Sequence, residues 1–319
     1  MKHHPLSTVL LGIVLLAWCT VATAVEESEL DRELRLSAAI GDTEQVNQLL
    51  DRGANVNAAN KFGKSALMMA VEGDNMETVA LLLARGANLN ARTVAGCTAL
   101  TFAAENGHIG ISALLIERGA NLHDRTKGGW DALMIASRYG ITDMVDQLLF
   151  KGADPKASDK HGRTALMQAA ENGHVDTVKM LIRAGAELES KDKLGETALI
   201  IAADKGHVDV MEALIAHGAD VNARDNEGAT ALIWAAGQED HEPVVKTLLV
   251  HGADPNIQDV DGISALMEAA RYGTPAVVDL LLQHGADTNL KDDKGRTAAE
   301  LAKEKGNPGV LKRIGSLSR

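Results

Sequence analysis

Aromatic side chains are scarce in this chain of 319 residues, which contains three Phe, three Trp and two Tyr. A core without many large rings must be filled by smaller aliphatic side chains that pack closely. Such side chains are abundant, since apolar residues make up 45% of the sequence. The composition therefore allows a stable core of Ala, Leu, Ile, Val and Met, and the length alone allows about two globular domains.

Basic residues are also under-represented. The chain has 32 Lys and Arg residues against 44 Asp and Glu residues, which gives a net charge of −12. The basic residues form no cluster along the sequence. A nucleic-acid-binding protein needs such a cluster to neutralise phosphates, so we expect no nucleic acid among the partners.

The first 24 residues differ in composition from the rest of the chain. A short polar and basic start at residues 2–4 precedes an apolar run at residues 9–19, and small residues stand at positions 22–24. This is the pattern of a secretory signal peptide, and we expect cleavage after Ala24. A membrane anchor is the alternative, but Ser and Thr residues limit the apolar run to well under the ~20 residues that a membrane-spanning helix needs.

Cysteine is limited to two positions, and Cys19 belongs to this leading segment. Lipidation of Cys19 is not expected, because the bulky Trp18 stands where a small residue precedes a lipidated cysteine. After cleavage Cys97 is the only thiol, so the exported chain has no internal disulfide and must be stable through packing alone. The sequence therefore predicts a periplasmic or secreted protein with no membrane contact after cleavage.

One unit recurs along the rest of the chain with a period of 33 residues. A Gly-Ala pair marks one position of the unit, with a single step of 34 residues, and its glycines are Gly53, Gly86, Gly119, Gly152, Gly185, Gly218, Gly252 and Gly285. A second series keeps the same period at Gly63, Gly96, Gly129, Gly162, Gly195, Gly228, Gly262 and Gly295. Such a period indicates a repeat protein in which stacked units share one core. The one extra residue, between Ala236 and Val245, predicts either a local loop or a small protrusion that contacts a partner.

The side chains of each unit indicate its local structure. A short polar residue such as Asp159 stands three positions before the second glycine, where it can bond its own backbone and set a tight turn. Two positions after that glycine comes a helix N-cap type such as Thr164. We expect a short helix from Ala165 to Asn172, followed by a second helix with an apolar stripe at helical spacing: Val175, Val178, Leu181 and Ile182.

This unit, a turn and two short antiparallel helices every 33 residues, resembles the ankyrin repeat. The resemblance extends from about Leu34 to the C-terminus and implies an all-α repeat solenoid of stacked helix-turn-helix units with short hairpin-like turns. Residues 164–167 depart from the family, whose usual Thr-Pro-Leu-His is Thr-Ala-Leu-Met here. We expect four parts along the chain: a signal peptide at 1–24, an N-terminal capping repeat at 25–58, seven full repeats at 59–291 and a C-terminal capping repeat at 292–319.

The sequence offers no convincing motif for catalysis or metal binding. Gly63-Lys64-Ser65 is similar to the end of a phosphate-binding loop, but Ala58 stands where that motif requires glycine. The histidines recur at repeat positions instead of clustering, and equivalent residues of stacked helices lie ~8–10 Å apart. Because the ligands of one metal ion must converge on it within ~2.1 Å, we expect no metal, no cofactor and no enzymatic activity.

The positions that the repeat leaves variable are where function is expected. Two of them are the residue after the turn glycine and the pair that ends the first helix, which the resemblance places on the concave face. Trp, Tyr and Arg most often anchor interfaces, so we predict these partner-binding residues: Trp130, Arg138, Tyr139, Arg163, Arg271 and Tyr272. The alternative is that Trp130 and Tyr139 only pack against each other and stiffen a turn.

A further variable position lies within the first helix. It is held in successive repeats by Phe102, Ile135, Ile201 and Trp234, among others. The resemblance implies an apolar, core-facing residue at this position. We therefore expect Trp234 to be buried.

The sequence thus predicts an exported protein of a bacterial periplasmic type that binds a partner protein and is a monomer. Two uses of that binding stay open. The protein is either a scaffold or stabiliser of a periplasmic enzyme, or an inhibitor or immunity protein that blocks a toxic hydrolase. An alternative from another class is a hydrolase whose site the sequence does not reveal.

Overall fold

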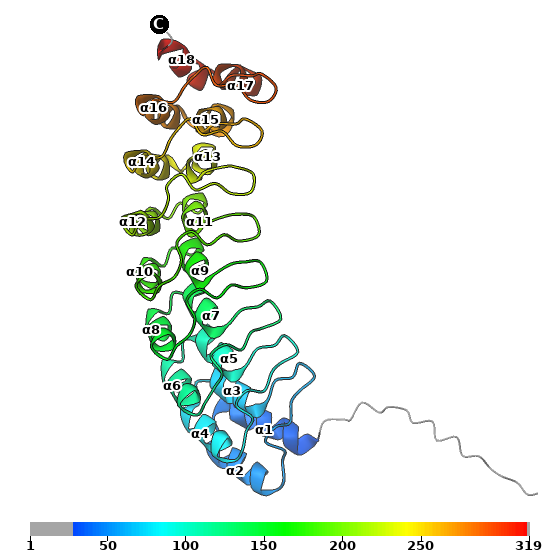
Figure 1. The fold of residues 1–319 in the computed structure, drawn as a ribbon. Helices are drawn as coiled ribbons and strands as arrows, with labels where there is room; N and C mark the ends of the chain where they lie inside the picture. The colour runs from blue at the N-terminus through cyan, green and yellow to red at the C-terminus, as the bar shows by residue number, and fades with distance from the viewer. Residues whose placement is uncertain (1–27, 318–319) are drawn as a thin grey trace, which may run out of the picture.

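The computed structural model describes residues 28–317, so the predicted signal peptide lies outside the described residues. Within residues 28–317 the chain forms eighteen α-helices and no strand, stacked as nine antiparallel pairs in a curved array (Figure 1). One helix of each pair lies beside the long loops, which project from the concave side of the array (Figure 1). The predicted all-α repeat solenoid is confirmed.

Each pair consists of an inner helix, next to the loops, and an outer helix. The inner helices are α1 (Glu29–Ile40), α3 (Ala66–Glu72), α5 (Ala99–Asn106), α7 (Ala132–Arg138), α9 (Ala165–Glu171), α11 (Ala198–Asp204), α13 (Ala231–Ala236), α15 (Ala265–Tyr272) and α17 (Ala298–Lys305). The outer helices are α2 (Thr43–Asp51), α4 (Met76–Ala84), α6 (Ile109–Glu117), α8 (Thr142–Phe150), α10 (Val175–Arg183), α12 (Val208–Ala216), α14 (Glu242–Val250), α16 (Pro275–Gln283) and α18 (Pro308–Leu317). Within residues 28–317, none of these helices combines the length and the apolar character needed to cross a membrane.

The inner helices from α3 onward begin at the predicted caps. In each, the side-chain oxygen of the cap accepts a hydrogen bond from the backbone N–H three residues later, and the caps are Ser65, Thr98, Asp131, Thr164, Thr197, Thr230, Ser264 and Thr297. A cap of this kind contributes about 1 kcal/mol. In α17 the Glu300 carboxylate also accepts the backbone N–H of Thr297 at 2.7 Å, which completes a capping box.

A short polar side chain sets the turn before each of these helices. Asp159 Oδ1 accepts the backbone N–H groups of His161 at 2.7 Å and Arg163 at 2.9 Å. Gly162 then adopts φ +81°, a conformation that glycine tolerates best. A Cβ atom on Gly162 would lie 3.1 Å from the Asp192 backbone, so the glycine also allows the next turn to pack closely.

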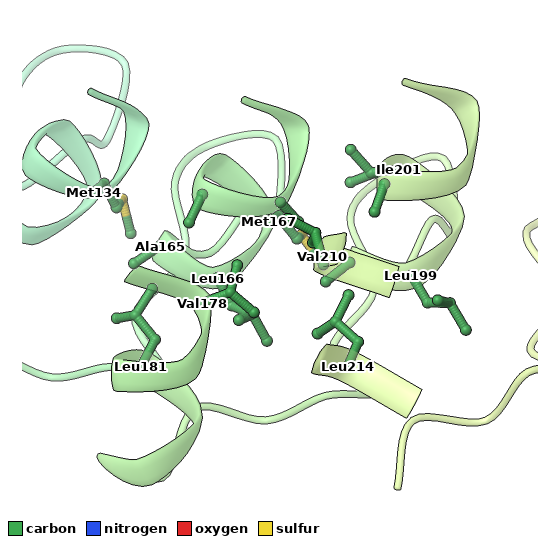
Figure 2. Close-up of a cluster of buried hydrophobic side chains, with 14 of the residues drawn as sticks. Met134, Ala165, Leu166, Met167, Val178, Leu181, Leu199, Ile201, Val210 and Leu214 are labelled. Atoms are coloured by element: carbon green, nitrogen blue, oxygen red, sulfur yellow. The ribbon is translucent and has the colours of Figure 1, made fainter. Parts of the chain in front are cut away.

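Aliphatic and methionine side chains fill the space between the helices (Figure 2). Leu166 of α9 and Leu181 of α10 are fully buried, and Leu199 and Leu214 continue the cluster into the next repeat. Each helix packs on its pair partner and on the equivalent helices of adjacent repeats. A continuous core therefore forms from small apolar residues, without many aromatic rings.

In three repeats, a histidine that precedes the outer helix links the repeat to the one before it. His174 Nε2 lies 2.9 Å from the carbonyl oxygen of Arg138, and His207 Nε2 lies 3.0 Å from that of Glu171. His108, two repeats before His174, makes the equivalent contact with the carbonyl oxygen of Glu72. The accepting carbonyls are in the last turn of an inner helix, where backbone carbonyls have no intrahelical N–H donor. These periodic histidines therefore stabilise the stacking of repeats.

Candidate protein-binding surface

Trp130, Arg138 and Tyr139 lie together on the inner side of the array. Trp130 precedes the cap of α7, Arg138 is the last residue of that helix, and Tyr139 follows it. The backbone of Trp130 is held at both ends, because its N–H donates to Thr126 Oγ1 at 3.1 Å and its carbonyl accepts the Thr126 N–H at 2.9 Å. Gly128 leaves room for the indole, since a Cβ atom there would lie 3.2 Å from Trp130 Cδ1.

The Arg138 guanidinium stacks on the Trp130 indole. Its Cζ atom lies 5.3 Å from the ring centroid, a geometry that contributes about 0.5–1 kcal/mol at an exposed site. Within residues 28–317, Arg138 has no ion-pair partner. Tyr139 beside it is 50% exposed. The surface therefore presents an uncompensated cation on an indole face, next to an accessible phenol.

Arg163 lies at the matching turn position of the next repeat, where three carboxylates surround it. Its guanidinium nitrogens lie 2.7 Å from Glu171, 3.3 Å from Asp192 and 3.6 Å from Glu196. Burial disfavours the charge of Arg163, but the hydrogen bonds and attraction from Glu171 and Asp192 outweigh it and raise the pKa of the guanidinium. Burial, followed by repulsion from Asp192, raises the pKa of Glu196. Arg163 therefore organises this turn and has less capacity left for a partner than Arg138 has.

Two adjoining hollows bring these four predicted residues together. The first, which we call the polar hollow, has a volume of about 780 Å³ and is lined by Arg163 and Gln168 as well as Trp130 and Arg138. The second, which we call the aromatic hollow, has a volume of about 460 Å³ and is lined by Tyr139 with the same Trp130 and Arg138. The stacked pair therefore lines both hollows.

A third hollow adjoins the aromatic hollow and was not predicted from the sequence. This apolar hollow has a volume of about 560 Å³, and its lining includes Phe62, Val94, Phe102 and Lys127. Phe62 is 63% exposed and Val94 is 58% exposed. Phe62 directly precedes a turn glycine, at a position that most other repeats fill with a small or polar residue. This unusual residue was the signal in the sequence from which the apolar hollow could have been predicted.

Arg271 and Tyr272 repeat the Arg-Tyr pair at the end of α15, but their surroundings differ. Arg271 lies 4.9 Å from the Tyr272 ring and 3.1 Å from the Glu268 carboxylate. The Lys305 ammonium lies 4.8 Å from the same ring. Hydrogen bonding from Lys305, followed by the charge of Arg271, lowers the pKa of the Tyr272 phenol. The Arg271 guanidinium of this second pair is therefore already paired with the Glu268 carboxylate.

The prediction that Trp234 lies in the core is wrong. Ile135 and Ile201 at the same repeat position are buried, but Trp234 is 39% exposed and its Nε1–H donates to Asp225 Oδ2 at 2.8 Å. An indole exceeds the space that isoleucine fills, and its N–H needs an acceptor. Phe102, the other large ring at this position, is only partly buried. Neither large ring at this position is fully buried.

Groups with catalytic potential are dispersed over the described part of the chain. Within residues 28–317, no three His, Cys, Asp or Glu side chains are placed to hold a metal ion. Cys97 is a partly buried free thiol that lines the aromatic and apolar hollows. The arrangement at the inner surface offers stacking, charge and apolar contact, which are means of binding.

The comparisons with known proteins agree with this architecture. The family model described as ankyrin repeats in three copies matches residues 34–126, 119–192, 184–259 and 232–315. The crystal structure of the human ASB11 ankyrin repeat domain is similar, with a TM-score of 0.63 and 28% identity over 70% of this chain and 98% of that chain. No curated protein sequence matches the chain. Ankyrin repeats are generally protein–protein interaction modules, and the chain belongs to the ankyrin repeat family.

Proposed function

We propose that the protein is exported and, as a monomer, binds a partner enzyme through the inner surface around Trp130, without catalysis of its own. The observation that carries this proposal is the stack of the exposed Arg138 on the partly buried Trp130, which lines two hollows and has Tyr139 beside it. Truncation of Trp, Tyr or Arg at the centre of an interface often costs about 2 kcal/mol or more. Hollows of about 460 and 780 Å³ have room for whole side chains of a partner.

The export part of the proposal rests on the composition of residues 1–24. Cell fractionation and sequencing of the mature N-terminus test it directly. A mature protein that begins after Ala24 supports export, and one that retains the leading segment contradicts it.

The partner can be identified by in vivo crosslinking of the exported protein followed by mass spectrometry. Two uses of the binding then separate by the activity of the partner in the complex. A supported or stabilised enzyme keeps or gains activity, whereas a toxic hydrolase held by an inhibitor or immunity protein loses it. Turnover by the purified protein alone, abolished by one substitution, would show instead that it is an enzyme.

The double substitution of Trp130 and Tyr139 by Ala tests the site. Both side chains are at least partly exposed, so we expect the thermal unfolding midpoint to stay within a few degrees. Capture of the crosslinked partner should weaken at least about tenfold, as expected when interface anchors are removed. The matched control is Phe150→Ala, which removes an 84% exposed ring from the outer helix α8 of the same repeat and should leave capture unchanged. If the double variant melts much earlier yet still captures the partner in the cold, the two rings are structural.

A further inference from the structure

The three hollows form one continuous inner groove. The polar and aromatic hollows share Trp130 and Arg138. The aromatic and apolar hollows share Cys97 and Lys127. The groove therefore runs from the turn that carries Phe62 to the turn that carries Leu194, across four repeat steps.

The inner groove has more cations than carboxylates in its lining, and the neighbouring carboxylates of Glu72, Glu196 and Asp204 pair with three of these cations. Its lining contains four carboxylates, Glu105, Asp159, Glu171 and Asp192, and six cations, Lys64, Lys127, Arg138, Arg163, Lys193 and Lys205. Two of the carboxylates, Asp159 and Asp192, are buried and accept backbone N–H groups. Within residues 28–317, Lys127, Arg138 and Lys193 have no ion-pair partner. In a chain with a net charge of −12, these three unpaired cations favour an acidic occupant.

The two ends of the inner groove differ in polarity. The apolar hollow exposes Phe62 and Val94 beside Lys127, and no carboxylate is among its lining residues. This end suits apolar side chains that alternate with acidic ones. The polar hollow at the other end carries most of the charged groups.

One buried group in the polar hollow lacks a partner. Gln168 is only 2% exposed, and its Oε1 atom makes no hydrogen bond within the described residues. Ile135 and Ile201 hold the same position in the adjacent repeats, so the fold does not require a polar side chain there. A buried acceptor without a donor is unfavourable. Since Gln168 lines the polar hollow, an occupant of the hollow can supply the missing donor.

We propose that the inner groove binds an extended segment of the partner protein that carries acidic and apolar side chains, and that Gln168 Oε1 accepts one of its N–H groups. Four repeat steps of ~8–10 Å each correspond to about 10–12 residues at ~3.3 Å per residue. The proposal rests on the proposed function, because it describes the part of the partner that this surface would hold.

The experiment is selection of random peptides of about 12 residues, displayed on phage, against the full chain. We expect the selected peptides to combine Asp or Glu with Phe, Leu or other apolar residues. Binding of a selected peptide, labelled with fluorescein and measured by fluorescence anisotropy, should weaken severalfold between about 50 mM and 500 mM salt, because exposed charges are screened.

Two substitutions then locate the peptide. Gln168→Ile introduces the side chain of the adjacent repeats, so the unfolding midpoint should stay the same or rise while the peptide binds at least about fivefold more weakly. Lys127→Glu reverses a charge on an exposed residue and should weaken binding at least about tenfold without affecting the fold. Phe150→Ala is again the matched control, with unchanged binding.

Three results overturn the proposal: no enriched peptide, a basic consensus, or binding that survives both Gln168→Ile and Lys127→Glu. The proposed function fails separately. If crosslinking finds a partner whose contacts avoid the inner groove, the groove proposal is wrong while a binding role stands. If crosslinking finds no partner, the binding role itself fails.

Discussion

Asp131 caps α7 with a carboxylate, where the other inner helices from α3 onward use a hydroxyl. Its side chain is 5% exposed and accepts the backbone N–H of Met134 at 2.9 Å. Burial raises the pKa of Asp131, although the hydrogen bond from Met134 opposes the shift. Since the pKa is higher in the native state, the native protein binds more protons than the unfolded chain between the two pKa values. Stability therefore falls as the pH rises through that window.

Replacement of Asp131 by Asn should stabilise the protein at neutral pH. Asn is as good a cap as Asp, and it carries no charge that burial can penalise. We expect the unfolding midpoint at pH 7 to rise by roughly 1–3 °C, and the gain to shrink as the pH falls through the pKa of Asp131. Thermal unfolding of both proteins followed by circular dichroism from pH 3 to pH 8 checks this. A gain that is independent of pH would show that the carboxylate charge is not the cause.

The local chemistry of a turn or a cap could be predicted because it depends on neighbours in the sequence. Thr164 caps α9 and Asp159 sets its turn, both within a few residues of their partners. The burial of Trp234 could not be predicted the same way. Its environment depends on whether the stacked helices leave space for an indole. The repeat position shows where the side chain lies, but it does not show how large a side chain the surrounding helices can accommodate.

At the scale of the helix, the end of each inner helix depends on the following repeat. Gly173 adopts φ +75° after α9, and a Cβ atom there would lie 2.9 Å from the His207 ring. The glycine therefore makes room for the ring whose Nε2 bonds the Glu171 carbonyl. His241, in the repeat with the extra residue, makes no such bond within residues 28–317. In this repeat Gln238 Nε2 donates instead to Asp204 Oδ1 at 3.1 Å, which links the repeat to the one before it.

His207→Ala should lower the free energy of unfolding by about 1–2 kcal/mol, because a helix-end carbonyl loses its donor. The matched control is His251→Ala, at an exposed residue that follows α14, and it should change stability by no more than about 0.5 kcal/mol. Urea unfolding of the three proteins measures the difference. Equal effects of the two substitutions would mean that the bond between repeats contributes nothing.

The period of the histidines was visible in the sequence, but their partners were not. A period reports that His174 and His207 are equivalent, without showing which atom of the preceding repeat each one contacts. The candidate site has the same limit. The repeat places Trp130, Arg138 and Arg163 near one another, but the stack of Arg138 on Trp130 and the carboxylates around Arg163 depend on side-chain conformations.

At the scale of the whole molecule, the main helix contacts within residues 28–317 join neighbouring repeats. Inner helix α15 packs on α13 and α17, and outer helix α16 packs on α14 and α18. Stability in such an array is the sum of local terms and nearest-neighbour interfaces. A binding surface that spans several repeats, such as the inner groove, therefore depends on the interfaces beneath it and only weakly on the distant end of the array.

A core substitution at the C-terminal end should lower the stability of the neighbouring repeats more than that of distant ones. Leu301 of α17 is 1% exposed, and Leu301→Ala should cost about 2–5 kcal/mol. Trp234 lies two repeats from α17 and Trp130 five repeats away, so variants that retain only one of these tryptophans report on different parts of the array. We expect Leu301→Ala to lower the urea midpoint reported by Trp234 more than the midpoint reported by Trp130. The control is Leu311→Ala, at a partly exposed leucine of α18, which should change neither midpoint by much. Equal shifts at both tryptophans would mean that the repeats unfold as one unit and that distant repeats do support the groove.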